Sequence, residues 1–203
     1  MGITSVKSFV ISIAAAALLA TAGPAHAQGT LLSNKIAFLN AIKERDALKA
    51  NELARTGGSA ILDVRGDDGS TPLTVTIARE DAEWTGFLIS KGANVNLPGK
   101  GGDTPLILAA RVGFHDAVRW LLSKKARVDQ TNRSGETALI AAVHQRQLPI
   151  VRLLLDAGAD PDKADTAAGL SARDYAKRDT RSRQILQAIE AKKPATTATN
   201  FRL

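Results

Sequence analysis

The chain has 203 residues, a formal net charge of +7 and no cysteine. The lack of cysteine excludes a disulfide, a thiolate nucleophile or metal ligand, and a lipid-modified N-terminal cysteine. Aromatic residues make up only 4% of the sequence. Because they are too few to build stacking platforms among the basic groups, we expect no nucleic-acid partner.

Residues 1–27 have the layout of a secretory signal peptide. Lys7 precedes an apolar run from Phe9 to Ala20, and Ala25 and Ala27 supply the small residues that specify cleavage. The alternative, a membrane anchor, is weaker because the run is shorter than the roughly 20 apolar residues of a bilayer span. We expect cleavage between Ala27 and Gln28, a periplasmic or secreted mature protein, and no membrane association afterwards. The mature chain keeps a net charge of +6 (26 basic minus 20 acidic residues).

Residues 28–66 predict two short helices. Ile36, Leu39 and Ile42 recur at helical spacing, Asp46 is placed to cap a second helix, and Gly57-Gly58 is placed to end it. Charged residues on this segment suit the end of a stack, which shows water the face that inner units bury. We predict a degenerate N-terminal capping repeat.

A motif then recurs with a fixed period. Thr71-Pro72-Leu73, Thr104-Pro105-Leu106 and Thr137-Ala138-Leu139 follow one another at a constant step of 33 (104 minus 71, 137 minus 104). A glycine precedes each triplet by two positions, and a pair of large aliphatic residues follows each at a constant distance. A constant period of this length indicates a solenoid of stacked units. It divides the chain into repeats at residues 67–99, 100–132 and 133–165.

A shorter unit follows at residues 166–191. The step from Gly135 to Gly169 is 34 (169 minus 135), so one residue has been inserted. Ile185, Leu186 and Ile189 give a closing helix its apolar stripe. We predict a C-terminal capping repeat here, and a disordered tail over residues 192–203, where Pro, Thr, Ala and Asn dominate.

Each recurring residue type meets a local need. Thr71 and Thr104 can cap a helix with their hydroxyls, and the proline that follows each occupies the first turn, where a missing N–H costs nothing. Alanine pairs such as Ala109-Ala110 let neighbouring helices approach closely. Gly92 and Gly158 are expected to end the second helix of their units with positive φ.

These residues resemble the ankyrin repeat, whose signature pairs a Gly-x-Thr-Pro-Leu opening with a later Leu-Leu and a Gly-Ala-Asp close. The segments 102–106 and 153–160 match it closely, and the resemblance covers roughly residues 33–191. It implies an all-α fold: an ankyrin-type solenoid of about four to five helix-turn-helix repeats with β-turn finger loops. It also implies binding of a protein and not catalysis.

Three departures from the family pattern are expected to have consequences. Thr74, Ile107 and Ile140 stand where the family usually has a histidine, so that residue's hydrogen bond is expected to be lost. Lys125 replaces a glycine at a left-handed position, at an expected cost of about 1 kcal/mol. Thr76-Ile77 replaces a pair of small residues, so the packing there is expected to differ.

The chemistry-bearing residues do not suggest an enzyme. After cleavage only His115 and His144 remain as histidines, and we expect no catalytic residue, cofactor or metal. Adjacent helical side chains such as His115 and Asp116 point about 100° apart and form no hydrogen-bonded pair. The run Gly99–Gly102 lacks the Lys-Ser/Thr pair of a phosphate-binding loop, so we interpret it as a flexible turn.

In the family that the motifs resemble, partners meet the loop tips and the exposed side of the first helix. By phase these positions are Asp67, Asp68, Ser70 and Arg79 in the first full repeat, Lys100, Asp103, Arg111 and Val112 in the second, and Arg133, Glu136, His144 and Gln145 in the third. The alternative is an ordinary solvated face. The positive charge favours an acidic protein partner or serves only solubility, and we expect a monomer.

The sequence therefore predicts an exported, non-catalytic scaffold or regulator that binds one protein partner. An inhibitor or protective accessory factor of a toxin or exported enzyme is the main alternative, and an enzyme with an atypical site is a remote one. A second basic cluster, Arg173, Lys177, Arg178, Arg181 and Arg183, serves solubility or meets an acidic protein or anionic lipid.

Overall fold

The computed structural model describes residues 24–192 as helices joined by short loops. The α-helices are α1 (Pro24–Glu44), α2 (Ala47–Thr56), α3 (Pro72–Ala78), α4 (Ala82–Ser90), α5 (Pro105–Val112), α6 (His115–Ser123), α7 (Ala138–His144), α8 (Leu148–Asp156), α9 (Ala172–Arg178) and α10 (Arg183–Ala191). Short 3-10 helices lie at η1 (Ser59–Ile61), η2 (Lys100–Gly102) and η3 (Thr180–Ser182). Most of the expected signal peptide and the tail after Lys192 lie outside the described residues.

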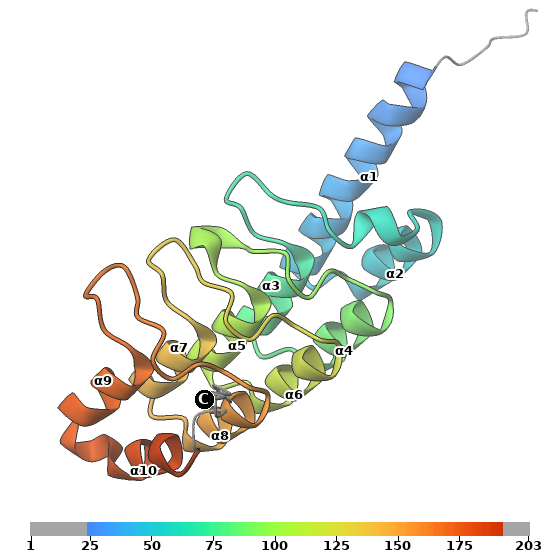
Figure 1. Ribbon diagram of the computed structural model, residues 1–203. Helices are drawn as coiled ribbons and strands as arrows, with labels where there is room; N and C mark the ends of the chain where they lie inside the picture. The colour runs from blue at the N-terminus through green and yellow to red at the C-terminus, as the bar shows by residue number, and fades with distance from the viewer. Residues whose placement is uncertain (1–23, 193–203) are drawn as a thin grey trace, which may run out of the picture.

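The helices form two parallel rows along a solenoid (Figure 1). An inner row of α3, α5, α7 and α9 and an outer row of α4, α6, α8 and α10 each pack neighbour against neighbour. Finger-like loops project from the starts of the inner helices, all to the same side. The solenoid predicted from the period and the all-α ankyrin-type architecture implied by the resemblance are both confirmed. Within residues 24–192 the only β-type pairing is an isolated bridge between Ala164 and Ser171.

Hydroxyl groups begin the inner helices as the spacing predicts. The side chains of Thr71, Thr104, Thr137 and Ser171 accept hydrogen bonds from backbone N–H groups three positions on, which would otherwise be unpaired. Pro72 and Pro105 occupy the first helical turn, where no N–H is needed. Asp46 caps α2 in the same way, accepting the N–H of Lys49 at 3.0 Å.

A continuous apolar spine fills the space between the rows. Leu121 and Leu154 are fully buried in it, and Ala109, Ala110 and Ala142 allow the inner helices to pack closely. The last helix, α10, closes the stack by burying Ile185 and Ile189. Every repeat thus buries apolar surface against its neighbours, which a single repeat could not do alone.

One side-chain contact is repeated at each of three seams. Asp63 Oδ1 accepts the N–H of Asn94 at 2.8 Å, Asn96 Oδ1 accepts that of Arg127 at 2.8 Å, and Asp129 Oδ1 accepts that of Asp160 at 3.0 Å. The acceptors are spaced by the same step as the Thr-Pro-Leu motif (96 minus 63, 129 minus 96). This seam ladder fixes the register of one repeat on the next.

The inserted residue of the last repeat lies at the tip of its finger. Asp129 and Asp162 keep the regular period, whereas Gly135 and Gly169 are one position further apart than it allows, so the extra residue falls between Asp162 and Gly169. Asp165 Oδ1 absorbs it by accepting the N–H groups of Ala168 (2.8 Å) and Gly169 (3.0 Å). The helices on either side are undisturbed.

Of the consequences expected from the departures from the family pattern, two are confirmed and one is wrong. Lys125 has φ 59° and Gly92 and Gly158 have φ 91°, as predicted. The expected loss of a hydrogen bond at Thr74 was wrong, because its hydroxyl is bonded to the backbone N–H and C=O of Thr71. The different packing expected at Thr76 is confirmed, since the buried Thr85 hydroxyl donates to Thr76 Oγ1 at 3.0 Å.

At the N-terminal end α1 begins at Pro24, so cleavage after Ala27 would remove its first turn. In the part of the chain from residue 24 to 192, no helix combines the length and apolar character needed to cross a bilayer.

Candidate protein-binding surface

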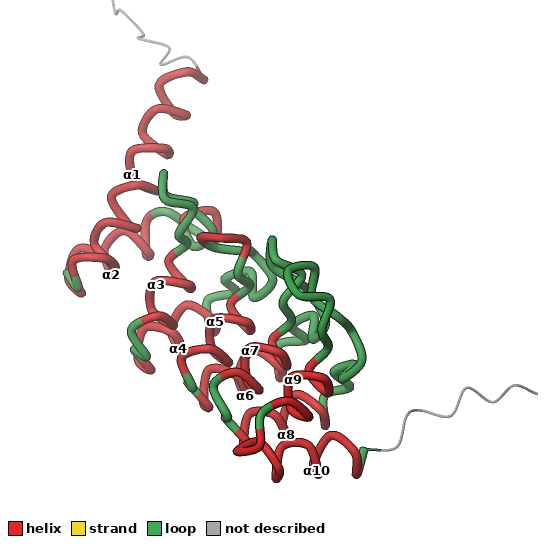
Figure 2. The backbone as a smooth tube through the Cα atoms, turned by 90° about the vertical axis from the view of Figure 1, so that its left-hand side faces the viewer, coloured by secondary structure: helices red, strands yellow, loops and turns green. Residues whose placement is uncertain are grey.

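The inner helices and the fingers line one face of the solenoid, called the concave face below (Figure 2). Two positions of the inner helices recur with the repeat and, apart from the buried Ala141, are at least partly exposed. The first is occupied by Val75, Leu108, Ala141 and Tyr175, and the second by Ala78, Arg111, His144 and Arg178. Along the solenoid both positions change from apolar at the N-terminal end to basic or aromatic at the C-terminal end.

An ion-pair network occupies the middle of the concave face. The Arg111 guanidinium on α5 makes a two-pronged contact with Asp103 and donates from Nη2 to Glu136 Oε2 at 2.5 Å. Asn132 Nδ2 donates to both Asp103 Oδ1 (2.8 Å) and Glu136 Oε2 (3.0 Å). These four residues join the second and third fingers, and Arg111 is the single cation between two carboxylates.

The network is half-buried, and its electrostatics follow from that. Burial alone would raise the pKa of Asp103, but hydrogen bonds from Arg111 and Asn132 together with the charge of Arg111 hold it below its usual value. The hydrogen bond to Asp103 raises the pKa of Arg111, with burial opposing and Glu136 adding to the effect. Asp103 and Arg111 are therefore both charged near neutral pH.

Beyond the network a second chain of contacts continues toward the C-terminal end. His144 Nδ1 lies 3.6 Å from Glu136 Oε1, and its ring meets that of Tyr175 edge to face with centroids 4.3 Å apart. The Tyr175 hydroxyl donates to Asp165 Oδ2 at 2.6 Å, and this bond raises the pKa of Tyr175 to about 12. The contact between Tyr175 and Asp165 therefore holds the last finger against α9.

Two cavities open on the concave face on either side of the network. One of about 420 Å³ lies between α3 and α5 under the second finger, and Thr74, Val75, Ala78, Lys100 and Leu108 are among its lining residues. The other, about 350 Å³, lies between α7 and α9 and is lined by Val143, His144, Tyr175, Arg178, Asp179 and Arg181. They are called the N-terminal pocket and the C-terminal pocket below.

The predicted partner-binding residues divide into two groups. Asp67, Lys100, Arg133, His144 and Gln145 are exposed, on fingers or at the end of α7, as the phase predicts. Asp103, Arg111 and Glu136 also lie on this face but bind one another, and Val112 packs partly against the core. Asp68 binds Ser70 and, at 3.3 Å, Lys43, and these contacts, the Ser70 hydroxyl first, lower its pKa to about 2.

Two predicted surface residues have structural roles instead. Ser70 is buried and its hydroxyl donates to Asp68, so its assignment to the exposed surface was wrong. Arg79 donates to the carbonyl oxygens of Ile42 (3.0 Å) and Lys43 (2.6 Å). It thereby satisfies acceptors at the C-terminal end of α1, where a positive charge is also favoured by the helix dipole.

The sequence did not single out Asn132 or Asp165, which organise the third and fourth fingers. Asn132 Oδ1 accepts the N–H groups of Ser134 and Glu136, which leaves its amide nitrogen to bind the two carboxylates. Asp165 occupies the same position one period later. The only signal in the sequence was an Asx residue three before the repeat glycine in Asn132-x-x-Gly135, a pattern typical of turns.

Basic residues of the last repeat are partly engaged with acids. Arg173 Nε contacts Asp162 Oδ1 at 2.6 Å, and Arg181 Nε lies 3.4 Å from Asp179 Oδ1. Asp179 also accepts from Arg146 Nε at 2.7 Å. Lys177, Arg178 and Arg183 are exposed. The predicted cluster is therefore a partly paired surface and not a uniform patch.

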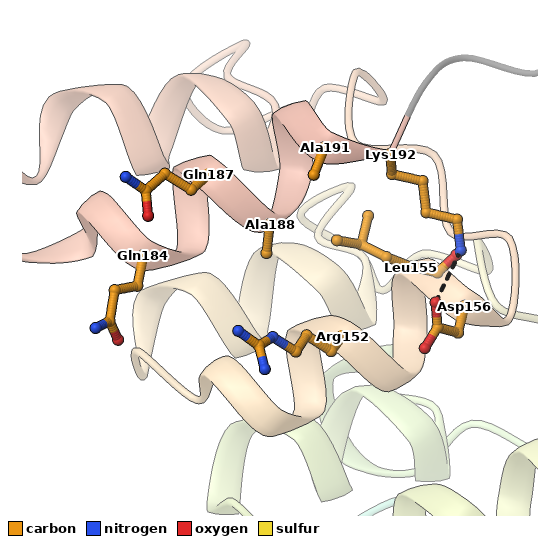
Figure 3. A pocket seen from close by; sticks show the side chains of 8 residues that line it. All are labelled: Arg152, Leu155, Asp156, Gln184, Gln187, Ala188, Ala191 and Lys192. Carbon is orange, nitrogen blue, oxygen red and sulfur yellow. Dashed lines mark hydrogen bonds and ion pairs between the residues drawn. The ribbon is translucent and has the colours of Figure 1, made fainter.

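A larger cavity, about 570 Å³, lies away from the concave face, between α8 and α10 (Figure 3). Arg152, Asp156, Gln184, Gln187 and Lys192 are among the residues that line it, and Lys192 Nζ lies 3.2 Å from Asp156 Oδ1. No group of three or more acidic or histidine side chains suited to a metal occurs in the described part of the chain. His115 Nδ1 and Asp116 Oδ1 are 3.9 Å apart, too far for a hydrogen bond, as predicted.

Comparison with known proteins agrees with this architecture. A family model described as ankyrin repeats (3 copies) matches residues 40–132 and 87–165, which together cover residues 40–165. A search of curated proteins found no match. Ankyrin repeats form protein–protein interaction modules, and the match spans more than half of the chain. The protein belongs to the ankyrin repeat family.

Proposed function

We propose that the protein is exported and that its concave face binds a protein partner, for which it acts as a scaffold or regulator. The observation that carries this proposal is the preformed character of that face. The ion pairs of Asp103, Arg111 and Glu136 are already satisfied by one another, so a partner meets a fixed surface and little entropy is lost in ordering it. Members of this family are typically non-catalytic, which agrees with a binding role.

The exposed finger residues Lys100 and Arg133 favour an acidic partner. They lie one repeat apart at finger tips and are not part of the Arg111 network. Exposed charges of this kind raise association rates and select partners more than they add affinity. Complex formation should therefore weaken with salt.

Site-specific photo-crosslinking tests the surface directly. A photoreactive residue placed at Lys100 or Arg133 should capture one partner in stoichiometric yield in cells. The same residue at Arg119 on the outer helix α6, which is also exposed, is the matched control. Equal capture from Arg119, or none from either finger, would reject the concave face as the binding surface.

Charge reversal tests the acidic character of the partner. Lys100→Glu and Arg133→Glu should each weaken capture by about tenfold at low salt, whereas Arg119→Glu should leave it unchanged. Neither finger residue is a member of the ion-pair network, so thermal unfolding should stay within a few degrees of the unmodified protein. An effect of Arg119→Glu equal to that of the finger variants would indicate a non-specific role of net charge.

Export rests on the N-terminal sequence and needs its own test. Expression with the native N-terminus, followed by fractionation and intact mass measurement, should yield a protein that begins at Gln28. Replacing Ala27 with Pro should leave the unprocessed chain. A cytoplasmic product of full length would reject export while leaving the binding proposal intact.

A further inference from the structure

The N-terminal pocket is suited to an apolar side chain. Val75 and Ala78 from α3 and Leu108 from α5 supply aliphatic walls, and the methyl group of Thr74 adds to them. Lys100 lines the outer edge, where its aliphatic stem can cover a bound side chain while its ammonium group stays in water. A pocket of about 420 Å³ with these walls has room for a leucine or phenylalanine side chain.

The C-terminal pocket is suited to an anion. Arg178 and Arg181 are exposed at its edge. The one carboxylate in its lining, Asp179, is bound by Arg146 at 2.7 Å and lies 3.4 Å from Arg181 Nε, so three cations surround one anion. Two further carboxylates contact lining residues but are already engaged, because Asp165 accepts from Tyr175 and Glu136 accepts from Arg111. The exposed charge of this pocket is therefore positive.

The distance between the pockets follows from the repeat geometry. One lies between α3 and α5 and the other between α7 and α9, which is two steps along the inner row. Packed helices are about 8–10 Å apart, so the pockets are separated by roughly 16–20 Å. An extended chain rises about 3.3 Å per residue and covers this distance in about five or six residues.

The surface between the pockets excludes an amphipathic helix as the occupant. Arg111, Asp103 and Glu136 fill it with charge, whereas a helix docking along the face would lay a continuous apolar stripe over them. A helix would also need about 11–13 residues to span the same distance, at about 1.5 Å per residue. An extended segment places peptide N–H and C=O groups over the network instead.

From these observations we infer that the concave face recognises an extended partner segment with a large apolar side chain and a carboxylate about five or six residues apart. The apolar side chain fills the N-terminal pocket, and the carboxylate binds Arg178 and Arg181. This inference rests on the proposed function and specifies what the partner must carry.

Fluorescence anisotropy with synthetic peptides tests the inference. The probes are labelled twelve-residue peptides of Ser, Thr and Gly that carry one Leu and one Glu, separated by two, five, six or ten positions, in both orders. Separations of five or six should bind tightest, and replacing Leu with Ser or Glu with Gln should weaken binding about tenfold. A preference for ten, or equal binding at every separation, would overturn the extended geometry.

Variants of the protein assign each anchor to its pocket. Ala78→Trp should fill the N-terminal pocket and abolish the advantage of Leu, and the double variant Arg178→Glu, Arg181→Glu should abolish that of Glu and transfer it to a Lys peptide. All three positions are exposed. Ala82→Trp and Arg119→Glu, exposed on the outer row, are the matched controls. Unchanged binding by either pocket variant would overturn that pocket's assignment.

The two proposals fail separately. If photo-crosslinking at Lys100 or Arg133 captures a partner but no peptide with the expected spacing binds, the recognition element is wrong and the binding function stands. If the concave positions capture nothing and the peptides do not bind, both proposals are rejected.

Discussion

In the second full repeat a residue other than glycine has a left-handed backbone conformation, which costs conformational free energy. Lys125 has φ 59°, and the positions one period before and after it are Gly92 and Gly158. In the left-handed region a Cβ atom approaches the following carbonyl oxygen, which costs roughly 1–2 kcal/mol. Arg45, Glu80 and Arg146 also have positive φ, at turns between the two helices of a repeat.

Lys125→Gly should therefore stabilise the protein by about 0.5–1 kcal/mol, an increase in the free energy of unfolding measured by urea denaturation. Lys124→Gly is the control, because Lys124 has φ −91° and a glycine there adds only freedom to the unfolded chain. If both variants lower stability, the backbone at residue 125 is not strained in solution.

Removing Arg111, the central cation of the concave face, should leave two neighbouring carboxylates to repel each other. In Arg111→Leu, Asp103 and Glu136 lose their shared partner, and we expect a loss of about 1–2 kcal/mol at pH 7, discounted for the partial exposure of the network. The loss should be smaller at pH 3, because the lowered pKa of Asp103 makes its contribution present above the ordinary value of 3.8 and lost as the pH falls below it. Urea denaturation at both pH values is the measurement, with exposed Arg119→Leu as the control.

At the residue scale, features that depend on neighbouring sequence positions were predicted better than features that depend on contacts with other repeats. Threonine caps, the proline positions and the left-handed Lys125 follow from the nearest four or five positions in the sequence, and all are confirmed. The burial of Ser70 and the binding of Arg79 to α1 depend on neighbours outside the local helix or turn. Phase places a side chain on a face but does not say whether another repeat already binds it.

At the scale of elements, one helix pair differs from the others in what joins it. In the later repeats alanines lie where the inner and outer helices pack closely. In the first full repeat α3 and α4 instead contact each other through Thr76 and Thr85, which are both buried. Thr76 Oγ1 also donates to the carbonyl oxygen of Leu73 at 3.0 Å. The pair is therefore held by a directional contact in place of close packing alone.

The two threonines should respond unequally to substitution by valine. Thr76→Val removes the acceptor of the Thr85 hydroxyl, which is fully buried, and should cost about 1–3 kcal/mol. Thr85→Val should cost less, because Thr76 keeps its bond to Leu73, and the double variant should recover part of the loss of Thr76→Val. Thermal unfolding of the three variants measures this, and equal losses in both single variants would contradict it.

At the scale of the whole molecule, stability should depend on pH in two windows. Asp68, Asp103, Asp162, Asp165, Asp174 and Asp179 have pKa values lowered from 3.8. A lowered pKa gives stability that is present above the unfolded value and lost as the pH falls through the folded one. The free energy of unfolding should therefore fall steadily below about pH 4.

The alkaline window depends on Tyr175. Its pKa is raised from 10.0 to about 12, so the stability it contributes is present below pH 10 and lost as the pH rises toward 12. Urea denaturation at pH 9, 10.5 and 12 should show a loss that is reduced in Tyr175→Phe. An identical alkaline loss in that variant would mean that the Tyr175–Asp165 bond does not form in solution.

The overall architecture could be predicted from the sequence because a solenoid has few free choices. A constant period with fixed caps determines the unit, and identical units can stack in only one register when each seam uses the same contact. The pockets could not be predicted in this way. They arise where the repeats differ, at Ala78 against Arg111 and at Tyr175 against Ala141, and such differences have no period.

The extra residue at the tip of the last finger shows where this chain tolerates a change of length. The helices and the seam contacts keep the regular spacing, while Asp165 Oδ1 holds the longer tip by accepting hydrogen bonds from two backbone N–H groups. Residues can therefore be inserted at a finger tip, where a ligand can contact them, without changing the helices and seams that support the finger. The finger-tip residues can then determine binding specificity, while the repeat spacing determines the fold.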